Sequence, residues 1–357
     1  MIFNTALFSV LIPFWLVNLF CFLVSLLITI VGIPSVIRIA KSKNLYNMPG
    51  ERTSHDHPVP RLGGTIVFAG IILPVIIFSG ENLPYELNNA IAGMVILFFI
   101  GIKDDVVSLV PYKKAVGQFL AACILVLPGN AIIIFFDFPG RFENLDTVAN
   151  VILSIFFIMA LINSINFVDG IDGLASGVGI LVSLILGIWF NFYSLFSYSV
   201  LRFSIIGALC TFTYYNVFSK KNKIFLGDTG SMLIGFLLSV LVIRFLNMSQ
   251  TCISTVCNSD FAIPFAFALL FVPVFDSIRI CLIRMYNGKS IFRADSNHVH
   301  HKVLKLTSSH LKASLIILSV NIAVISYTYL LRDLGSFFLI ASLIIFGTIF
   351  SILLGRF

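Results

Sequence analysis

The chain has 357 residues, of which 59% are hydrophobic and only 11% carry a charge. Soluble domains carry about 25% charged residues, so this composition excludes an ordinary water-soluble protein and indicates a polytopic membrane protein. The net charge of +7 is divided among short loops. A charge divided in this way favours contact with anionic lipid headgroups, and we expect no nucleic-acid partner.

Apolar runs near 20 residues predict membrane-spanning helices. Eleven such runs follow one another along the chain, at 10–37, 64–80, 88–102, 115–135, 147–164, 174–193, 196–218, 230–247, 260–283, 313–331 and 335–355. Broken or tilted helices blur such a scan, and ten spans are the alternative. No basic residue precedes the first run, so we expect it to stay as a span rather than be cleaved as a signal peptide. We predict an all-α membrane protein with about eleven transmembrane helices and a single domain over residues 1–357.

Orientation follows from Lys and Arg, which favour cytoplasmic loops. With the N-terminus outside, most of the 23 basic residues fall on the inner side. The opposite orientation would put them outside, so we predict an outer N-terminus and a cytoplasmic C-terminus. Cys252 and Cys257 then share an outer loop; a disulfide could form there in an oxidising compartment, although free cysteines are the stronger expectation.

The predicted inner loops carry the polar clusters. The first contains Pro60-Arg-Leu-Gly-Gly64, in which glycine lets backbone approach a phosphate. The second contains Asp104 and Asp105, adjacent acids that repel each other unless a metal or other cations hold them. All of the clusters fall on one face of the membrane, which indicates a shared site there.

The third inner loop, residues 163–174, combines amides and acids between apolar segments. Asn166, Asp169 and Asp172 recur at a spacing of three and share a face if a helical turn continues through them. An ionised Asp costs about 2.5–3.5 kcal/mol in hydrocarbon, so these acids should face a cavity or the aqueous edge, where a cation can hold them. Oxygen ligands of this kind suggest Mg²⁺.

The fourth loop places several lysines before Phe225 and then Gly227-Asp-Thr-Gly-Ser231 at the start of an apolar run. A helix N-terminus offers free N–H groups to an anion, although Asp or Ser at such a position is also a common cap. The fifth loop holds Arg293 and the motif His298-Val-His-His301. Histidines can bind Zn²⁺, but no Cys lies nearby and the adjacent cations suit phosphate better.

Together the loops supply acids for a hard divalent cation, basic residues and imidazoles for phosphates, and Phe225 as a stacking surface. A nucleoside-diphosphate substrate needs these three features. Phosphoryl transfer depends mainly on positioning and charge neutralisation, and a metal can bridge a diphosphate and polarise the bond to be broken. The apolar helices would hold a lipid co-substrate with its head at the inner surface.

With these motifs the chain resembles the polyprenyl-phosphate N-acetylhexosamine-1-phosphate transferases of the bacterial UDP-GlcNAc type, in glycosyltransferase family 4. The motifs that carry the resemblance are Pro60–Gly64, Asp104-Asp105, Asn163–Leu174, Phe225–Ser231 and His298–His301. The resemblance implies Mg²⁺-dependent transfer, with Mn²⁺ as an alternative, of a sugar 1-phosphate from a UDP-N-acetylhexosamine to undecaprenyl phosphate. UMP would leave, and the product would be a lipid-linked sugar diphosphate for cell-envelope glycan synthesis. It further implies the bacterial cytoplasmic membrane, and we allow for a homodimer.

The resemblance also assigns roles to individual residues. Asp228 matches the metal-ligand Asp, with Asn166 as second ligand, and Asp104, Asp105 and Asp228 form the catalytic acids. The substrate-binding residues are Asn163, Asp169, Asp172, Asn216, Phe225, Arg293, His298, His300 and His301. Phe225 would stack on uracil, and the histidines with Arg293 would meet the diphosphate or sugar. Direct attack of the lipid phosphate on the sugar-bearing phosphate is preferred to a two-step route through an aspartyl-phosphate.

Two other functions remain open. The translocase that transfers phospho-MurNAc-pentapeptide has three consecutive histidines, whereas this chain has His-x-His-His. A secondary transporter of an anionic solute also combines many spans with intramembrane acids. Transporter sites lie near the membrane midplane, whereas these acids lie at the inner ends of the predicted helices.

Overall fold

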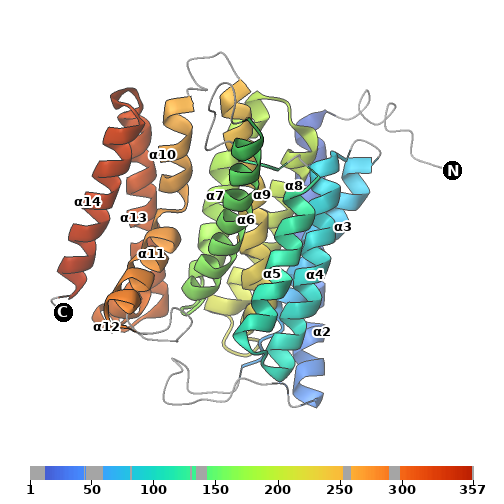
Figure 1. Cartoon of the computed structure of the whole chain (residues 1–357). Coiled ribbons are helices and arrows are strands. Elements are labelled where there is room, and N and C mark those ends of the chain that lie inside the picture. The colour runs from blue at the N-terminus through green and yellow to red at the C-terminus, as the bar shows by residue number, and fades with distance from the viewer. Residues whose placement is uncertain are drawn as a thin grey trace.

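The computed structural model describes residues 13–43, 45, 59–80, 83–128, 131–133, 143–251, 259–288 and 298–355. Every regular element within these ranges is helical (Figure 1). The elements are α2 (Phe14–Ser42), α3 (Gly63–Ser79), α4 (Tyr85–Val107), α5 (Pro111–Val126), α6 (Glu143–Val168), α7 (Leu174–Phe192), α8 (Phe196–Thr213), η2 (Tyr214–Phe218), α9 (Gly227–Thr251), α10 (Ser259–Leu269), α11 (Phe271–Tyr286), α12 (Val299–Thr307), α13 (His310–Leu330), η3 (Arg332–Leu334) and α14 (Ser336–Gly355). The prediction of an all-α protein is confirmed for the described residues.

Seven helical segments are long and apolar enough to cross a membrane. They lie in α2, α6, α7, α8 with η2, α9, α13 and α14. The bent pair α10 and α11 makes an eighth if it is one span, and α3 is a shorter apolar helix. The chain is therefore a multi-pass membrane protein, while the number of eleven spans and the orientation stay predictions.

Two apolar runs form shorter or broken helices. The run at 115–135 gives α5, which ends at Val126, two residues before Pro128. The run at 260–283 gives α10 and α11, whose axes differ by 81°. Pro273 lies in the first turn of α11 and has no N–H to donate to the carbonyl of Leu269.

An amide from another helix repairs this break. Asn321 of α13 donates from Nδ2 to the Leu269 carbonyl at 3.0 Å and accepts the Val272 N–H at 3.1 Å through Oδ1. Buried backbone groups need such partners, above all within a bilayer. The bend is therefore a built feature rather than a frayed helix.

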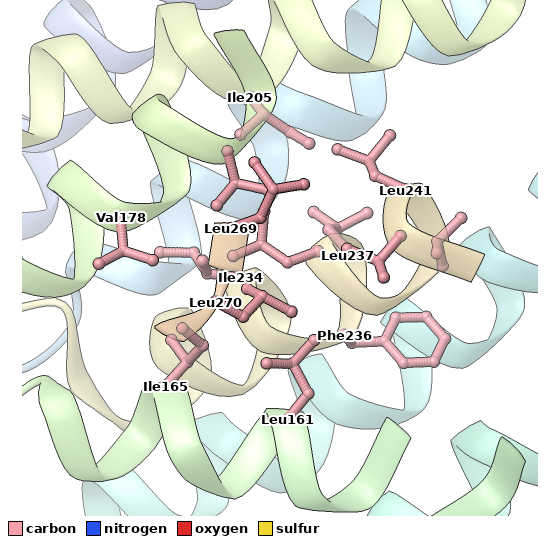
Figure 2. Packing of buried hydrophobic residues seen from close by; sticks show 14 of the residues in the cluster. Leu161, Ile165, Val178, Ile205, Ile234, Phe236, Leu237, Leu241, Leu269 and Leu270 are labelled. Carbon is pink, nitrogen blue, oxygen red and sulfur yellow. The ribbon is translucent and has the colours of Figure 1, made fainter. Parts of the chain in front are cut away.

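The core lies around α9, which is almost wholly buried, whereas α14 is mostly exposed. Figure 2 shows Leu161 of α6, Val178 of α7 and Ile205 of α8 around Ile234 on α9. Small residues let these helices approach closely: a Cβ on Gly235 would lie 2.6 Å from the Ile162 Cα. Packing of this kind fixes α9 as the rigid centre of the bundle.

The described parts of the polar motifs lie at one end of the bundle, the lower one in Figure 1, where α12 also lies. The chain reverses direction between successive long helices, so α4 and α6 end there and α5, α7 and α9 begin there. This arrangement brings the motifs of distant sequence segments to a single surface.

Candidate active site

The N-terminus of α9 is held by a carboxylate from another helix. Asp105, near the end of α4, accepts the backbone N–H groups of Asp228 at 2.7 Å and Thr229 at 3.0 Å. The Thr229 hydroxyl donates to the same carboxylate at 2.5 Å. A negative group at a helix N-terminus satisfies unpaired N–H groups and complements the helix dipole. Asp105 therefore fixes the backbone that carries Asp228.

Glycines make this contact between α4 and α9 feasible. A Cβ on Gly101, one turn before Asp105, would lie 2.4 Å from the Thr229 Cα. Gly227 has φ +74°, and a Cβ there would lie 2.7 Å from the Asp105 carboxylate oxygens. Only glycine combines this backbone conformation with so little space.

The Pro60–Gly64 motif pairs with the segment that precedes α9. Gly63 and Gly64 donate their N–H groups to the carbonyls of Phe225 at 2.9 Å and Leu226 at 2.8 Å, and Phe225 donates its own N–H to the Pro60 carbonyl at 2.8 Å. The expectation was that phosphate would approach these glycines. Their N–H groups instead hold Phe225 and the start of α9 in place.

A lysine that the sequence reasoning missed lies among the predicted acids. The Lys114 ammonium on α5 forms ion pairs with Asp228 and, at 3.3 Å, with Asp104, and it lies 3.4 Å from Asn166 Oδ1. Asn166 Nδ2 donates to Asp228 Oδ1 and to the Ser231 hydroxyl, both at 2.7 Å. The two predicted metal ligands and the first catalytic acid thus surround one positive charge.

Asp169 is the acid without a counter-charge in contact. It lies half-buried between α6 and α7, and its carboxylate makes no hydrogen bond or ion pair with another described residue. The pKa of its carboxyl is raised well above the ordinary value, first by burial and then by the charges of Asp228, Asp105 and Asp172, and the positive charge of Arg61 offsets only part of this rise. Such an excess of negative charge marks a place where a further cation is favourable.

Asp172 connects its loop to two other elements. Its carboxylate lies 2.6 Å from the Lys223 ammonium and 3.5 Å from His310 Nδ1 on α13. The Lys223 ammonium also lies 5.5 Å from the centre of the half-buried Phe225 ring. Asp172 therefore helps to hold the segment before Phe225, while its predicted part in substrate binding stays a prediction.

The predicted substrate-binding amides make contacts within the protein. Asn163 donates to Gln118 at 2.8 Å, which links α6 to α5. Asn216, with only 4% of its surface exposed, accepts the Gly173 N–H at 2.7 Å and donates to the Ile224 carbonyl at 3.0 Å. Asn216 lies in the π-helical turn η2, and its two hydrogen bonds join the loop after α6 to the segment before α9. It therefore supports the site by holding the backbone of these two segments.

The histidine motif reaches the third loop. His298 precedes α12, and its Nδ1 lies 2.8 Å from Asp276 Oδ2 on α11. The rings of His298 and His300 stack with centroids 5.4 Å apart, and His301 lies 4.2 Å from His300. A Cβ on Gly170 would lie 2.5 Å from His300 Nε2, so this imidazole rests directly on the residue after Asp169.

His300 is a neutral imidazole at neutral pH. Burial, reinforced by His301 and His298, lowers its pKa to about 3. Its Nδ1 is buried and has no hydrogen-bond partner among the described residues. The ring therefore has one buried nitrogen that no described residue satisfies.

A metal among the histidines is disfavoured by the bonds already present. Ligand-type atoms of Asp276, His298 and His300 lie within 4.8 Å of one another. However, Asp276 accepts from the Arg279 guanidinium at 2.7 Å and from the Val299 N–H at 3.1 Å, in addition to its contact with His298. These donors already satisfy the carboxylate, and a guanidinium repels a metal cation.

The structure thus brings together side chains from three of the five predicted loop motifs, together with Lys114, around the start of α9. The gathered side chains are Asp104, Asp105, Lys114, Asn166, Asp169 and Asp228. Three residues named from sequence, Arg293, Cys252 and Cys257, lie outside the described residues.

The bundle defines a multi-pass membrane protein with a charged site at one end. Residues 88–246 match the family described as glycosyl transferase family 4. The chain is 31% identical, over 83% of its length and 80% of the relative, to a probable undecaprenyl-phosphate N-acetylglucosaminyl 1-phosphate transferase of Bacillus subtilis. The chain belongs to glycosyl transferase family 4.

Relatives from other bacteria support this membership. The decaprenyl-phosphate N-acetylglucosaminephosphotransferase of Mycobacterium tuberculosis is 31% identical over 75% of this chain and 71% of the relative. The undecaprenyl-phosphate alpha-N-acetylglucosaminyl 1-phosphate transferase of Escherichia coli O157:H7 is 28% identical over the same shares. The resemblance inferred from the motifs is therefore confirmed at the level of the family.

Proposed function

We propose that this protein transfers N-acetylhexosamine 1-phosphate, with GlcNAc as the default sugar, from a UDP-sugar to undecaprenyl phosphate and releases UMP. The names of its relatives specify N-acetylglucosaminyl 1-phosphate transfer with undecaprenyl or decaprenyl phosphate. The observation that carries the proposal is the acidic cluster around Asp228, in which the Asp169 carboxylate makes no ion pair with a described residue. Such a cluster suits a metal-bound diphosphate.

The cofactor in this proposal is Mg²⁺, with Mn²⁺ as the alternative. The Lys114 ammonium lies among oxygens of Asp228, Asp104 and Asn166, so these oxygens already accommodate a positive charge. Carboxylate and amide oxygens are the donors that a hard cation prefers, and Asp228 and Asn166 would hold it. The ion, when bound, would neutralise diphosphate charge and polarise the bond to the leaving group.

Asp104 and Lys114 orient the lipid phosphate. A phosphate monoester has a second pKa of about 6 and is already mostly dianionic at neutral pH, so it needs no strong base. Its oxygen bonds to the sugar-bearing phosphorus, the bond from that phosphorus to the bridging oxygen breaks, and the electron pair leaves with UMP. Lys114 compensates the charge of Asp104 and allows the anionic lipid head to approach.

The nucleotide lies against the neighbouring loops. Phe225 is fixed by backbone pairing with Pro60 and Gly63, so its ring is a preformed surface for uracil. His298, His300 and His301 meet the diphosphate or the sugar, together with Arg293. Asp172 and Asn216 hold the loops, and Asn163 supports α6.

The lipid chain needs an apolar surface beside the site. α11 exposes Ile278, Leu282 and Met285 on one face by 50%, 60% and 62%, and the same helix carries Asp276 next to His298. A polyprenyl chain lying on this face would place its phosphate near the polar end of the bundle. We assign the protein to the bacterial cytoplasmic membrane, with the site on the cytoplasmic side, and its product to cell-envelope glycan synthesis.

The test is UMP release by purified protein in detergent. The assay contains undecaprenyl phosphate, Mg²⁺ and a panel of UDP-N-acetylhexosamines, and controls omit the lipid or the metal. We expect release only when all three components are present. Silence with these donors but turnover with UDP-MurNAc-pentapeptide would identify the translocase instead, and silence with every donor would favour a transporter.

A further inference from the structure

Asp276 is a buried carboxylate inside an otherwise apolar helix. Only 2% of its surface is exposed. Arg279, one turn later on α11, donates to Oδ1 from Nη2 at 2.7 Å and from Nε at 3.2 Å. The Val299 N–H donates to Oδ1 at 3.1 Å, and His298 Nδ1 lies 2.8 Å from Oδ2. A buried charge is costly unless it is fully bonded, and this one joins α11 to the beginning of α12.

The contact with Oδ2 fixes the hydrogen on the His298 ring. An ionised carboxylate can only accept hydrogen bonds, and the three donors on Oδ1 favour the ionised form. His298 therefore donates its Nδ1–H to Asp276 and keeps Nε2 for a ligand; Nε2 donates to a phosphate oxygen when the ring carries its second hydrogen. No described residue forms a hydrogen bond with Nε2.

Two ring contacts restrict the imidazole of His298. The Phe167 ring is tilted by 38° with its centroid 5.4 Å away, and the His300 ring is stacked at 5.4 Å with the two imidazole planes 17° apart. His300 in turn rests on Gly170, beside Asp169. The direction of His298 Nε2 is thus set by one hydrogen bond and two ring contacts before any substrate arrives.

We propose that Asp276 is a positioning residue for the transfer reaction: it aligns His298 so that Nε2 meets the diphosphate of the sugar nucleotide. The inference rests on the proposed function, because it takes that diphosphate as the ligand. Asp276 acts through His298 and does not touch substrate itself. A residue that merely anchored α12 would act through its bond to Val299 instead.

The test is a double-mutant cycle with Asp276→Asn and His298→Ala. Asn has one acceptor oxygen where the carboxylate has two, so it cannot accept from Arg279 and Val299 and also from His298 Nδ1. The imidazole therefore loses its fixed partner. Carboxylates that orient metal-bound imidazoles contribute about tenfold to a hundredfold, and we expect a loss of this size in kcat/KM for the UDP-sugar. The KM for undecaprenyl phosphate should stay unchanged. In the His298→Ala background, Asp276→Asn should cause no further loss, because the two residues act as a unit.

Val303→Ala is the matched control for the anchoring role. Val303 lies on α12 with only 3% of its surface exposed, so the substitution loosens the packing of α12 and changes neither His298 nor Asp276. This variant should keep kcat/KM within about twofold of the unmodified protein if Asp276 acts through His298.

Binding of UDP, measured by calorimetry on the detergent-solubilised protein, gives a readout that does not depend on turnover. Asp276→Asn should raise the Kd for UDP by about tenfold or more while the Kd for UMP changes less. Should the Asn variant fail to fold, Asp276→Glu replaces it, because it keeps the charge but displaces the carboxylate from the imidazole.

The outcomes distinguish failure of the proposed function from failure of the positioning role of Asp276. Absence of turnover with every donor refutes the proposed function, and UDP binding still decides the role of Asp276. Additive losses in the cycle would overturn the positioning role, and so would a Val303→Ala variant as impaired as Asp276→Asn. UDP affinity that is absent, or that is the same in the unmodified protein and in Asp276→Asn, would overturn it as well.

Discussion

Replacing Asp105 with Asn should destabilise the protein although the side chain hardly changes in size. Three donors from Asp228 and Thr229 point at the two carboxylate oxygens. Asn keeps one acceptor, so at least one N–H of α9 faces an NH₂ group. A half-buried donor without a partner costs about 1–3 kcal/mol, and loss of the charge at the helix terminus adds about 0.3–1 kcal/mol. We expect a total of about 1.3–4 kcal/mol.

The assay is thermal unfolding in detergent followed by intrinsic fluorescence. At about 2–4 °C per kcal/mol for large domains, the midpoint should fall by several degrees. Asp104→Asn is the matched control: Asp104 accepts the Leu109 N–H at 2.6 Å and pairs with Lys114, so it makes no bond to α9. It should lose turnover with little loss of stability. Equal midpoints for Asp105→Asn and the unmodified protein would refute the capping role.

Four further changes test other parts of the site. Asp228→Ala should reduce turnover by at least about a hundredfold with folded protein retained, and near-normal UMP release would remove Asp228 as a metal ligand. Phe225→Ala should raise the KM for the UDP-sugar by about tenfold, since base stacking contributes about 1–3 kcal/mol; an effect limited to the lipid KM would contradict stacking. Gly101→Ala places a Cβ 2.4 Å from the Thr229 Cα, so the unfolding midpoint should fall as expected for overpacking of about 1–3 kcal/mol. Lys114→Met should tighten Mg²⁺ binding in the absence of substrate, as measured by thermal shift, and unchanged binding would place the ion away from this lysine.

Sequence reasoning could predict the gathering of the acids because helix ends on one side of a membrane must lie near one another. Asp104, Asn166 and Asp228 come from segments more than 50 residues apart, yet all three contact the same ammonium. Lys114 is not among the site residues predicted from the sequence, in which the basic residues of this loop serve only to predict orientation. Its position between two acidic motifs was the available signal.

Asp276 was missed for a different reason. It lies within the apolar run at 260–283, which predicts a membrane span. A hydropathy scan averages over about 20 residues, so a single acid hardly changes its value. The cost of a charge in hydrocarbon was the signal, since an acid there needs partners.

The different surroundings of Asp104 and Asp105 could not be predicted from their adjacency. Consecutive residues on a helix point about 100° apart. The partner of Asp105 is 123 residues away in sequence, so its identity depends on how α4 and α9 dock. The bend between α10 and α11 likewise depends on Asn321, a residue of a later helix.

The carboxylates that bond the first N–H groups of α9 and α12 belong to the earlier helices α4 and α11, which bears on biosynthesis. Asp105 leaves the ribosome long before Asp228, and at that stage it has no helix terminus to bond. The site therefore does not exist in a nascent chain, and it comes into being only when α9 enters the membrane and docks on α4. Catalytic competence thus reports completed assembly of the bundle.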